Sequence, residues 1–591
     1  MPDGVRLLAE RLIASDDDAL AAAFAVRRVA PDAQWSDFFD AADALLTDAS
    51  VHTALAALPA AELAALAAGH AGPEAQHLLL ADADGAPLPA VRDVLDIVLG
   101  GGAGSVAEAD VSGASASLPS APPLAAAEQA RVAENAFAAL SDLADLLLRT
   151  DTTPLALIGS GALAAADRKV LAEELQRPDT IDDLLLLAEL AGLVARLERR
   201  IIATAGAQDW LAQGATDRWF RVADAWANAL PAPLRAAGGS SGASAGASAG
   251  GSAGASAGGF AAVEAWAGAY PADPAWPARA AALAAAGATW GALGPEGSLA
   301  PWASELGSDP VASTARTALA ALLPAEVDRI YLQNDLTAIA PGPLQGELDA
   351  RLRRLARRES HAQASTYRFS AASIADGMAA GESEASTLAF LTEISLTGVP
   401  QPLEYLVRQA GARFGAVRVV TDAETGRTRV ESADTGLIDQ IAIDQALRPL
   451  GLVDDGEALA TRVGRDAVLW ALRDARYPAV AVGLDGDVVR APRHRAPAAP
   501  AAADVDYAPL IARLRGADAD DADAAWLTRE LDAAVRARAA IEVDVALPGG
   551  ETRTFVLEAA GLGGGRLRGK DLAADVERTL PVSSISAVRR R

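Results

Sequence analysis

Three low-complexity stretches divide the 591-residue chain, and a packed core cannot run through any of them. Residues 100–125 and 236–259 are rich in Gly, Ala and Ser, and residues 491–505 are rich in Pro and Ala. A chain of this length is also too long for a single core. The sequence therefore predicts linkers over 100–125, 231–260 and 491–505. They separate folded segments at 1–99, 126–230, 261–323, 324–490 and 506–591.

The composition excludes several kinds of site. There is no Cys, so disulfides, thiolate metal sites and Cys nucleophiles are ruled out. The five His are scattered, and Gly72 and Pro73 interrupt the spacing between His70 and His77. We therefore predict no metal and no cofactor.

A formal net charge of −27 repels phosphates at long range. Any contact with nucleic acid must then come from a local basic patch. The first residues lack the basic and apolar regions of a signal peptide, and Asp, Glu and Arg interrupt the Ala-rich runs. These features predict a cytoplasmic protein with no membrane segment.

Helical spacing dominates the first half of the chain. Asp16–Asp18 are suited to cap a helix in 1–99, and residues 181–212 read as helix, two short strands and helix, the pattern of a winged helix. Gly159, Gly161 and Ala164 imitate a dinucleotide-binding turn, G-x-G-x-x-A. No second apolar strand ending in an acid follows, so an ordinary turn is favoured. Seven Trp at mostly helical spacing are predicted to be core: Trp210, Trp219, Trp226, Trp266, Trp276, Trp290 and Trp302.

The segment 324–490 carries the first candidate site. A strand ends at Pro341-Gly342-Pro343, and an amphipathic helix over 344–360 follows, with Leu348, Leu352 and Leu355 as its apolar stripe. The opposite side carries the arginines Arg351, Arg353, Arg354, Arg357 and Arg358. Such a row can bind a phosphate backbone. The alternative is a solvated face whose charges form internal ion pairs.

Residues Gly563–Asp571, "GGGRLRGKD", carry the second candidate site. They fit most of the phosphate-binding loop G-x-x-x-x-G-K-[S/T], but Asp571 replaces the hydroxyl that holds Mg²⁺, and too little chain follows for a nucleotide-binding sheet. We interpret the segment as a turn into a strand that places Arg566, Arg568 and Lys570 on one face, where they can contact an anion.

Catalytic residues are not evident in the sequence. Asp335 is a lone acid in an apolar strand, where it is expected to accept backbone N–H bonds, and Gln401 between two prolines reads as a helix start. The prediction is a protein that is not an enzyme.

Three phrases in 324–490 resemble a known family: "YLQNDLTAIAPGPL", "STYRFSAASIADGMAAG" and "FLTEISLTGVPQPLEYLV". They are similar to bacterial helicase-associated proteins that carry the XPB/Ssl2-type helicase N-terminal domain. The upstream residues 154–226 resemble the helical half of the same proteins. The resemblance implies an accessory module of helicase and DNA-repair machinery. In true helicases two large α/β motor domains follow, and 506–591 is too short for them.

The last segment resembles a different module, the small β-rich WYL-type domain, which implies binding of nucleic acid or nucleotides. The name-giving Trp-Tyr-Leu would fall near Arg566-Leu567-Arg568, so those aromatics are missing. Together the resemblances imply a multi-domain α+β protein that is predominantly α-helical.

The implied function is that of a non-catalytic accessory protein that binds DNA weakly, in a salt-sensitive manner, or binds a separate helicase. The alternative is a ligand-responsive regulator whose WYL-like domain senses a nucleotide or a single strand. Neither a membrane nor a metal is expected as a partner.

Overall fold

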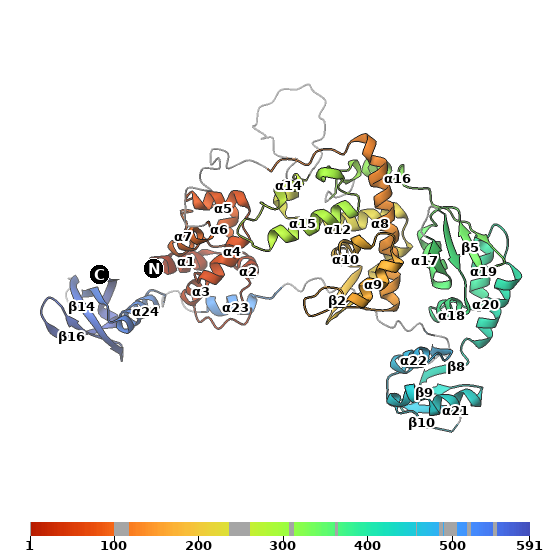
Figure 1. The fold of residues 1–591 in the computed structure, drawn as a ribbon. Coiled ribbons are helices and arrows are strands. Elements are labelled where there is room, and N and C mark those ends of the chain that lie inside the picture. The colour runs from red at the N-terminus through yellow and green to blue at the C-terminus, as the bar shows by residue number, and fades with distance from the viewer. Residues whose placement is uncertain are drawn as a thin grey trace. The chain divides into compact units, whose positions relative to one another are not determined.

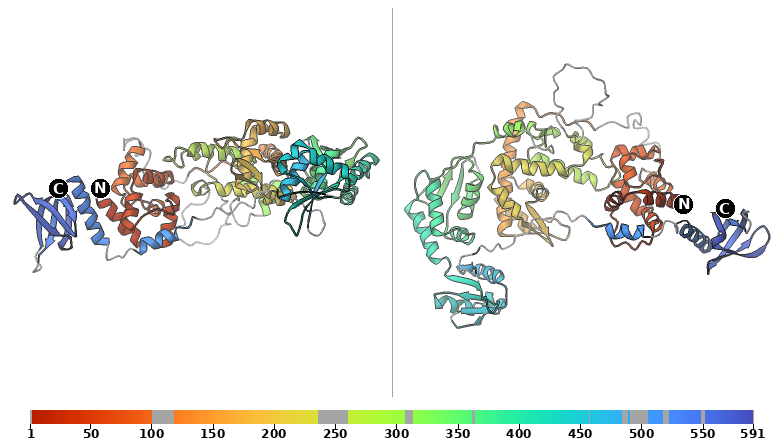
Figure 2. Two further views of the ribbon diagram at one scale, coloured as in Figure 1. Left: turned by 90° about the horizontal axis from the view of Figure 1, so that it is seen from below. Right: turned by 180° about the vertical axis from the view of Figure 1, so that it is seen from behind.

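The computed structural model describes residues 2–99, 118–235, 260–306, 313–360, 364–456, 458–483, 489, 505–516, 522–547 and 552–590. Contacts divide the chain into two units, residues 1–116, 267–278 and 503–591, and residues 117–266 and 279–502. Figures 1 and 2 show the elements of each unit. Most of the predicted linker residues, 100–117, 236–259 and 491–504, lie outside the described residues.

Short helices form the N-terminal part of the first unit. They are α1 (Pro2–Ala14), α2 (Asp17–Val26), α3 (Phe38–Leu45), α4 (Asp48–Ala56), α5 (Ala60–Ala67), α6 (Pro73–His77) and α7 (Pro89–Val98). Asp16 and Asp37 cap α2 and α3, because their carboxylates accept backbone N–H bonds of the first turns. The apolar faces of the helices meet in one core. The predicted cap at Asp16 is confirmed.

A helix from the far end of the sequence completes this core. In α23 (Ala508–Arg515), Leu510, Ile511 and Leu514 are buried among the N-terminal helices. The Tyr507 hydroxyl donates to the Val29 carbonyl at 2.8 Å. The sequence-based boundary at 506 is therefore displaced: residues 505–516 pack with the N-terminal helices. Spacing along a helix shows that it has an apolar face, but not which core that face will cover.

The C-terminal part of the first unit is a five-stranded antiparallel sheet with one helix against it, α24 (Ala522–Ala537). Its strands, in the order β16-β15-β14-β13-β17 across the sheet, are β13 (Ala540–Ala546), β14 (Thr552–Gly563), β15 (Arg566–Asp571), β16 (Val576–Pro581) and β17 (Ile585–Arg590). The buried alternate residues of β13, among them Ile541 and Val543, share a core with Leu557 and Leu567. The predicted β-rich C-terminal region is confirmed.

The second unit begins with a helix and three-stranded sheet arrangement. Its elements are α8 (Ala126–Thr152), β1 (Leu155–Ala156), α9 (Ala165–Glu174), α10 (Ile181–Leu190), β2 (Val194–Leu197) and β3 (Arg200–Ala203), with sheet order β1-β3-β2. Gly159 and Gly161 lie in a turn, where Gly161 N donates to Ile158 O at 2.9 Å and Gly161 has a φ of +83°. The predicted turn is confirmed.

Buried tryptophans lie in or next to most of the helices that follow. These helices are α11 (Ala205–Ala212), α12 (Ala215–Ala229), α13 (Ala232–Arg235), α14 (Val263–Trp266), α15 (Trp276–Thr289) and α16 (Ser313–Ala320). Trp219 and Trp290 donate their indole N–H groups to each other's carbonyls, at 2.7 and 3.0 Å. Trp226 donates to Leu283 O at 2.8 Å. All seven predicted core tryptophans are buried, which confirms the prediction.

The chain then forms a mixed module, which we call the 330–414 module. It contains β4 (Tyr331–Leu332), β5 (Thr337–Ala340), α17 (Gly346–Leu355), β6 (Arg357–Ser360), β7 (Ser365–Arg368), α18 (Ala371–Ala379), α19 (Glu384–Ile394) and α20 (Gln401–Arg413). Its antiparallel sheet has the order β4-β5-β7-β6. Asp335 lies in the turn between β4 and β5 and not within a strand, and it accepts Thr337 N at 3.2 Å, as expected. Helix α20 begins at Gln401 after Pro400, as expected from the sequence.

A second sheet with its own core follows, so the segment predicted as 324–490 holds two cores. The strands β8 (Val417–Thr421), β9 (Thr428–Glu431), β10 (Val453–Asp454), β11 (Ala458–Thr461) and β12 (Ala479–Val482) take the order β10-β11-β9-β8-β12. Its helices are α21 (Thr435–Ile443) and α22 (Arg465–Asp474). The pair β8–β12 is parallel, and the other pairs of this sheet are antiparallel.

Candidate nucleic-acid interface

The arginine row predicted on one helix is divided between two elements. Helix α17 ends at Leu355, and Ala356 takes an extended conformation. Arg357 and Arg358 belong to β6, which pairs with Arg368 and Tyr367 of β7. The expected helix over 344–360 is therefore too long, because cross-strand pairing in the sheet overrides helix propensity.

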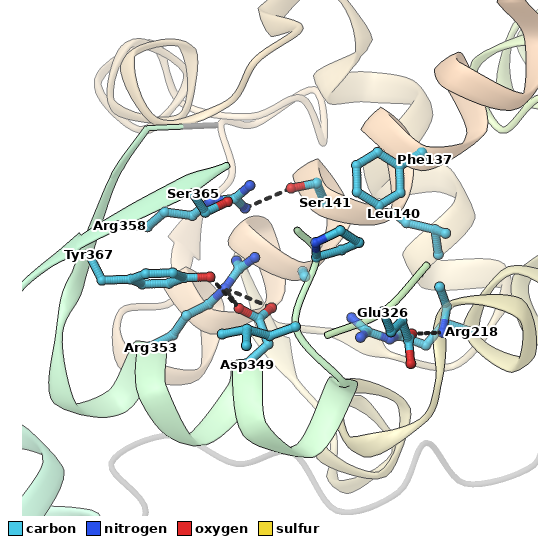
Figure 3. A pocket seen from close by; sticks show the side chains of 14 residues that line it. Phe137, Leu140, Ser141, Arg218, Glu326, Asp349, Arg353, Arg358, Ser365 and Tyr367 are labelled. Atoms are coloured by element: carbon cyan, nitrogen blue, oxygen red, sulfur yellow. Dashed lines mark hydrogen bonds and ion pairs between the residues drawn. The ribbon is translucent and has the colours of Figure 1, made fainter. Parts of the chain in front are cut away.

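Two of the five arginines are buried. The side chains of Arg353 and Arg358 are 7% and 9% exposed, and both face Asp145 of α8. Arg353 pairs with Asp145 through Nη1, and Arg358 Nη1 lies 3.5 Å from Asp145 Oδ2. Arg353 Nε also donates to Asp349 Oδ1 at 2.9 Å, and the Tyr367 hydroxyl donates to the same oxygen at 2.8 Å. We call these five residues the buried arginine cluster; Figure 3 shows four of them, Asp349, Arg353, Arg358 and Tyr367.

The charges within the cluster shift the pKa of Arg353 and of Asp349 in the directions that keep both groups ionised. Burial alone would lower the pKa of Arg353, but the charges of Asp145 and Asp349 raise it. Burial alone would raise the pKa of Asp349, but Arg353 and the Tyr367 hydroxyl lower it. Burial and then the nearby charge of Arg353 lower the pKa of Arg358. Arg353 and Asp349 are thus held as an ion pair.

The other three arginines differ in how far their guanidinium groups are free to bind an external anion. Arg351 donates to both carboxylate oxygens of Glu382, at 2.7 and 2.8 Å, and stacks over the Phe390 ring at 4.3 Å. Arg354 is half-buried and donates from Nε to the carbonyl of Ala350 at 3.1 Å. Arg357 is exposed on β6. The predicted five-arginine surface therefore does not exist as one exposed face, and DNA binding by its members stays a prediction.

A small cavity of about 50 Å³ lies beside the cluster (Figure 3). Leu140 and Ser141 of α8, Arg218 of α12, Glu326 and Ser365 contribute to its lining. Ligand sites for nucleotide-sized molecules have volumes of roughly 300–1,000 Å³. This cavity has room only for about one or two water molecules.

The second candidate surface forms as the sequence predicts. Gly564 and Gly565 make the hairpin turn with φ of +59° and +71°. Along β15 the residues alternate, so that Arg566, Arg568 and Lys570 are exposed while the residues between them are buried. We call these three residues the β15 cation stripe.

Asp571, at the Mg²⁺-ligand position of the phosphate-loop pattern, is engaged within the fold. Its carboxylate accepts Ala573 N at 2.9 Å, Ala574 N at 3.1 Å and Arg578 Nε at 2.5 Å. The hydrogen bond from Arg578 lowers the pKa of Asp571. Asp571 therefore closes the β15–β16 turn, and the segment is a hairpin.

The neighbours of the β15 cation stripe make its three charges unequal. Lys570 pairs with Asp575 at 2.6 Å and lies opposite Glu558 and Glu577 in the sheet. Arg568 lies opposite Gly561 and Thr579, and Arg566 opposite Gly563 and Pro581. Arg566 and Arg568 have no ion pair within the described ranges. The stripe thus offers two available cations.

Sequence reasoning missed the residues of α8 that face the arginines, Ser141 and Asp145. A signal was present, because "LSDLADLLL" places Asp142 and Asp145 in an otherwise apolar helical run. Asp142 is also buried, where it accepts Gln176 N at 2.9 Å. Acids in such positions indicate partners elsewhere in the chain.

Within the part of the chain that the structure describes, no three or more His, Asp or Glu side chains gather as a metal site. None of the helices in the described ranges is long and apolar enough to cross a membrane.

Comparison with known proteins assigns one segment. No match is found among curated proteins. Residues 330–454, which run from the 330–414 module into the second sheet, match the family model of the helicase conserved C-terminal domain. This part of the chain is therefore helicase-related.

Proposed function

We propose that the protein is a non-catalytic accessory component of helicase-dependent DNA transactions. The observation that carries this proposal is the match of residues 330–454 to the helicase conserved C-terminal domain. The matched family is a helicase C-terminal domain, whereas the phrases in 324–490 resemble an XPB/Ssl2-type N-terminal domain. A relationship to XPB/Ssl2-type proteins and a role in repair are part of the proposal.

The sheet topology of the matched region supports an accessory role rather than that of an ATP-hydrolysing motor domain. A nucleotide-hydrolysing motor uses parallel strands with crossover helices and a phosphate-binding loop. Among the described strands of the two sheets in 331–482, β8 and β12 form the one parallel pair. The nearest sequence to a phosphate loop, at Gly564–Lys570, forms the β15 hairpin.

The first part of the second unit has the element order of a winged helix: helix, strand, two helices and a two-stranded wing. In such domains the third helix enters the major groove. Here that helix is α10, and its acids are engaged within the fold: Asp182 pairs with Arg168 at 2.7 Å, and Asp183 accepts the Thr289 hydroxyl at 2.6 Å. Helix α10 also packs against α12. We therefore do not assign DNA reading to this domain.

The β15 cation stripe is the surface we propose for contact with DNA. Arg566 and Arg568 are exposed, lack acidic neighbours across the sheet, and lie beside glycines that leave the backbone open. Neutralising two phosphates gives a salt slope of about −1.8 on duplex DNA. Binding of this kind is weak and sensitive to salt.

Fluorescence anisotropy with a labelled duplex, over a salt series, tests this proposal. We expect that the double substitution R566Q/R568Q removes most of the slope, whereas K570Q, which replaces the cation already paired with Asp575, changes it little. Equal effects of the two variants would contradict the assignment. A DNA-stimulated ATPase activity of the purified chain would refute the non-catalytic role.

A second candidate function is a regulator whose WYL-like C-terminal domain senses a nucleotide. The same two arginines and the open hairpin end favour it, because Gly561, Gly563, Gly564 and Gly565 have no atom within 4 Å of a Cβ position. Calorimetric titration of the full chain with nucleoside mono- and triphosphates distinguishes the two functions. Tight binding of a nucleotide, abolished by R566Q/R568Q, would favour the regulator.

A further inference from the structure

We propose that Asp145 of α8 takes the place of a nucleic-acid phosphate at Arg353 and Arg358, so that α8 masks an anion-binding site of the 330–414 module. The site is closed in this structure, and opening the contact would expose it. The identity of the anion rests on the proposed function, because a protein that acts on DNA meets the phosphates of DNA.

The contact geometry is that of anion recognition. Two guanidinium groups converge on one carboxylate, Arg353 directly and Arg358 at 3.5 Å, and Arg358 Nη1 also donates to Ser141 Oγ at 2.7 Å. Guanidinium groups recognise carboxylates and phosphates with the same planar donors. A group that holds Asp145 in this way is therefore also suited to hold a phosphate oxygen.

The charges on the two sides of the contact are complementary. The module brings Arg353, Arg358 and Asp349, which leave one net positive charge, and Tyr367 donates its hydroxyl to Asp349. Helix α8 brings the carboxylate of Asp145, while its other buried acid, Asp142, faces Arg177 at 3.7 Å. Without Asp145, the module side keeps an excess positive charge in a half-enclosed, largely desolvated position, where an anion would be attracted.

The contact between α8 and the 330–414 module can open without unfolding the module. The apolar core of the module consists of residues between 327 and 414 and does not continue into α8. Polar and apolar groups both meet at the contact. The polar groups are the buried arginine cluster and a hydrogen bond of 2.7 Å from Ala215 N to Glu326 Oε1, and the apolar side chains of Leu140 and Leu344 line the cavity of about 50 Å³. A contact that leaves the module's own core complete can have a closed and an open state.

The test compares two variants of the full-length chain that remove the same charge from the same helix. D145N removes the masking carboxylate, and E134Q removes an exposed carboxylate of α8. Anisotropy with a labelled duplex and with inorganic polyphosphate as competitor is measured over a salt series. Hydrogen exchange of residues 346–360 reports whether the contact opens.

We expect D145N to bind duplex DNA at least tenfold more tightly than wild type, with a salt slope steeper by about 0.9 for the one net positive charge that the module side keeps. E134Q should bind as wild type does, and the triple substitution D145N/R353Q/R358Q should lose the gain. If D145N does not fold, S141A serves instead. It removes only the hydroxyl contact to Arg358, and a smaller gain is expected.

Each outcome decides the inference. Faster exchange in 346–360 without a gain in anion binding would show that the cluster is structural only, and unchanged exchange in the folded variants would show that Asp145 does not hold the contact closed. Either result overturns the proposal. A gain for polyphosphate without any binding of DNA would support the masked site and reject the proposed DNA function. A gain that persists in the triple variant would place the anion elsewhere and also overturn it.

Discussion

Gly346, the first residue of α17, gives the sharpest test of the contact between the 330–414 module and the helices before it. Helix propensity alone predicts that Gly346→Ala stabilises the protein, by up to about 1 kcal/mol. In the structure, a Cβ atom at this position would lie 2.0 Å from the carbonyl oxygen of Gln213 and 2.8 Å from Nη2 of Arg218. The Gln213 carbonyl belongs to the backbone, so it cannot rotate away as a side chain can.

The balance of these terms favours destabilisation. Inserting a methyl group into a packed contact costs typically 1–3 kcal/mol. Moving the Gln213 carbonyl also disturbs the 2.8 Å hydrogen bond that it accepts from Arg218 Nε, and a bond to a charged group contributes about 1.5–3 kcal/mol. After the propensity gain, we expect a net loss of roughly 2–5 kcal/mol in this contact.

Hydrogen exchange across α17, together with scanning calorimetry of the full chain, measures this loss. The matched control is Gly4→Ala in α1, where the nearest atom to the new Cβ is Pro89 Cδ at 3.5 Å, an ordinary contact. We expect Gly4→Ala to be neutral or stabilising and Gly346→Ala to accelerate exchange in α17. A Gly346→Ala protein as stable as the control would refute the close approach of Gln213 and with it the tight fit of this contact.

Three further predictions concern other parts of the fold. Trp290→Phe removes the indole donor to the Trp219 carbonyl and should cost about 1–3 kcal/mol, seen as a lower unfolding temperature. The pKa of Asp349 is lowered in the folded protein, so its ionised form stabilises the fold above the ordinary aspartate pKa of about 3.9, and this stabilisation is lost as the pH falls through the folded pKa. The difference in unfolding temperature between wild type and D349N should therefore shrink below about pH 4. A difference that stays constant with pH would contradict the ion pair. Gly565→Ala forces a side chain into the left-handed region and should destabilise the C-terminal sheet by roughly 1–2 kcal/mol, measured by exchange in β14 and β15, whereas unchanged exchange would speak against the hairpin.

Features that depend on neighbouring residues could be predicted from the sequence. The alternation of Arg566, Arg568 and Lys570 follows from the period of a strand, and the structure confirms it. The turn at Gly161 and the start of α20 at Gln401 follow from Gly and Pro, whose backbone preferences are local. The buried tryptophans follow from their large apolar area.

Features that depend on distant partners could not be predicted. Nothing near Arg353 shows that Asp145, more than two hundred residues earlier, will neutralise it. An arginine row therefore has the same appearance in the sequence whether it is exposed or buried. The end of α17 at Leu355 has a similar cause, since β6 forms only because β7 is available to pair with it.

The placement of α23 has a consequence for how the chain matures during synthesis. Phe24 and Tyr507 pack edge to face with ring centroids 5.9 Å apart, and Arg515 Nη1 donates to the Ile13 carbonyl at 2.6 Å. At translation rates of about 5–20 residues per second, the N-terminal helices wait on the order of 20 to 80 seconds before α23 emerges. During that interval the apolar groove that Leu510, Ile511 and Leu514 will fill is open to water and to other chains. Nascent chains halted before residue 505 should therefore recruit holdase chaperones, and release of α23 from the ribosome should end that dependence.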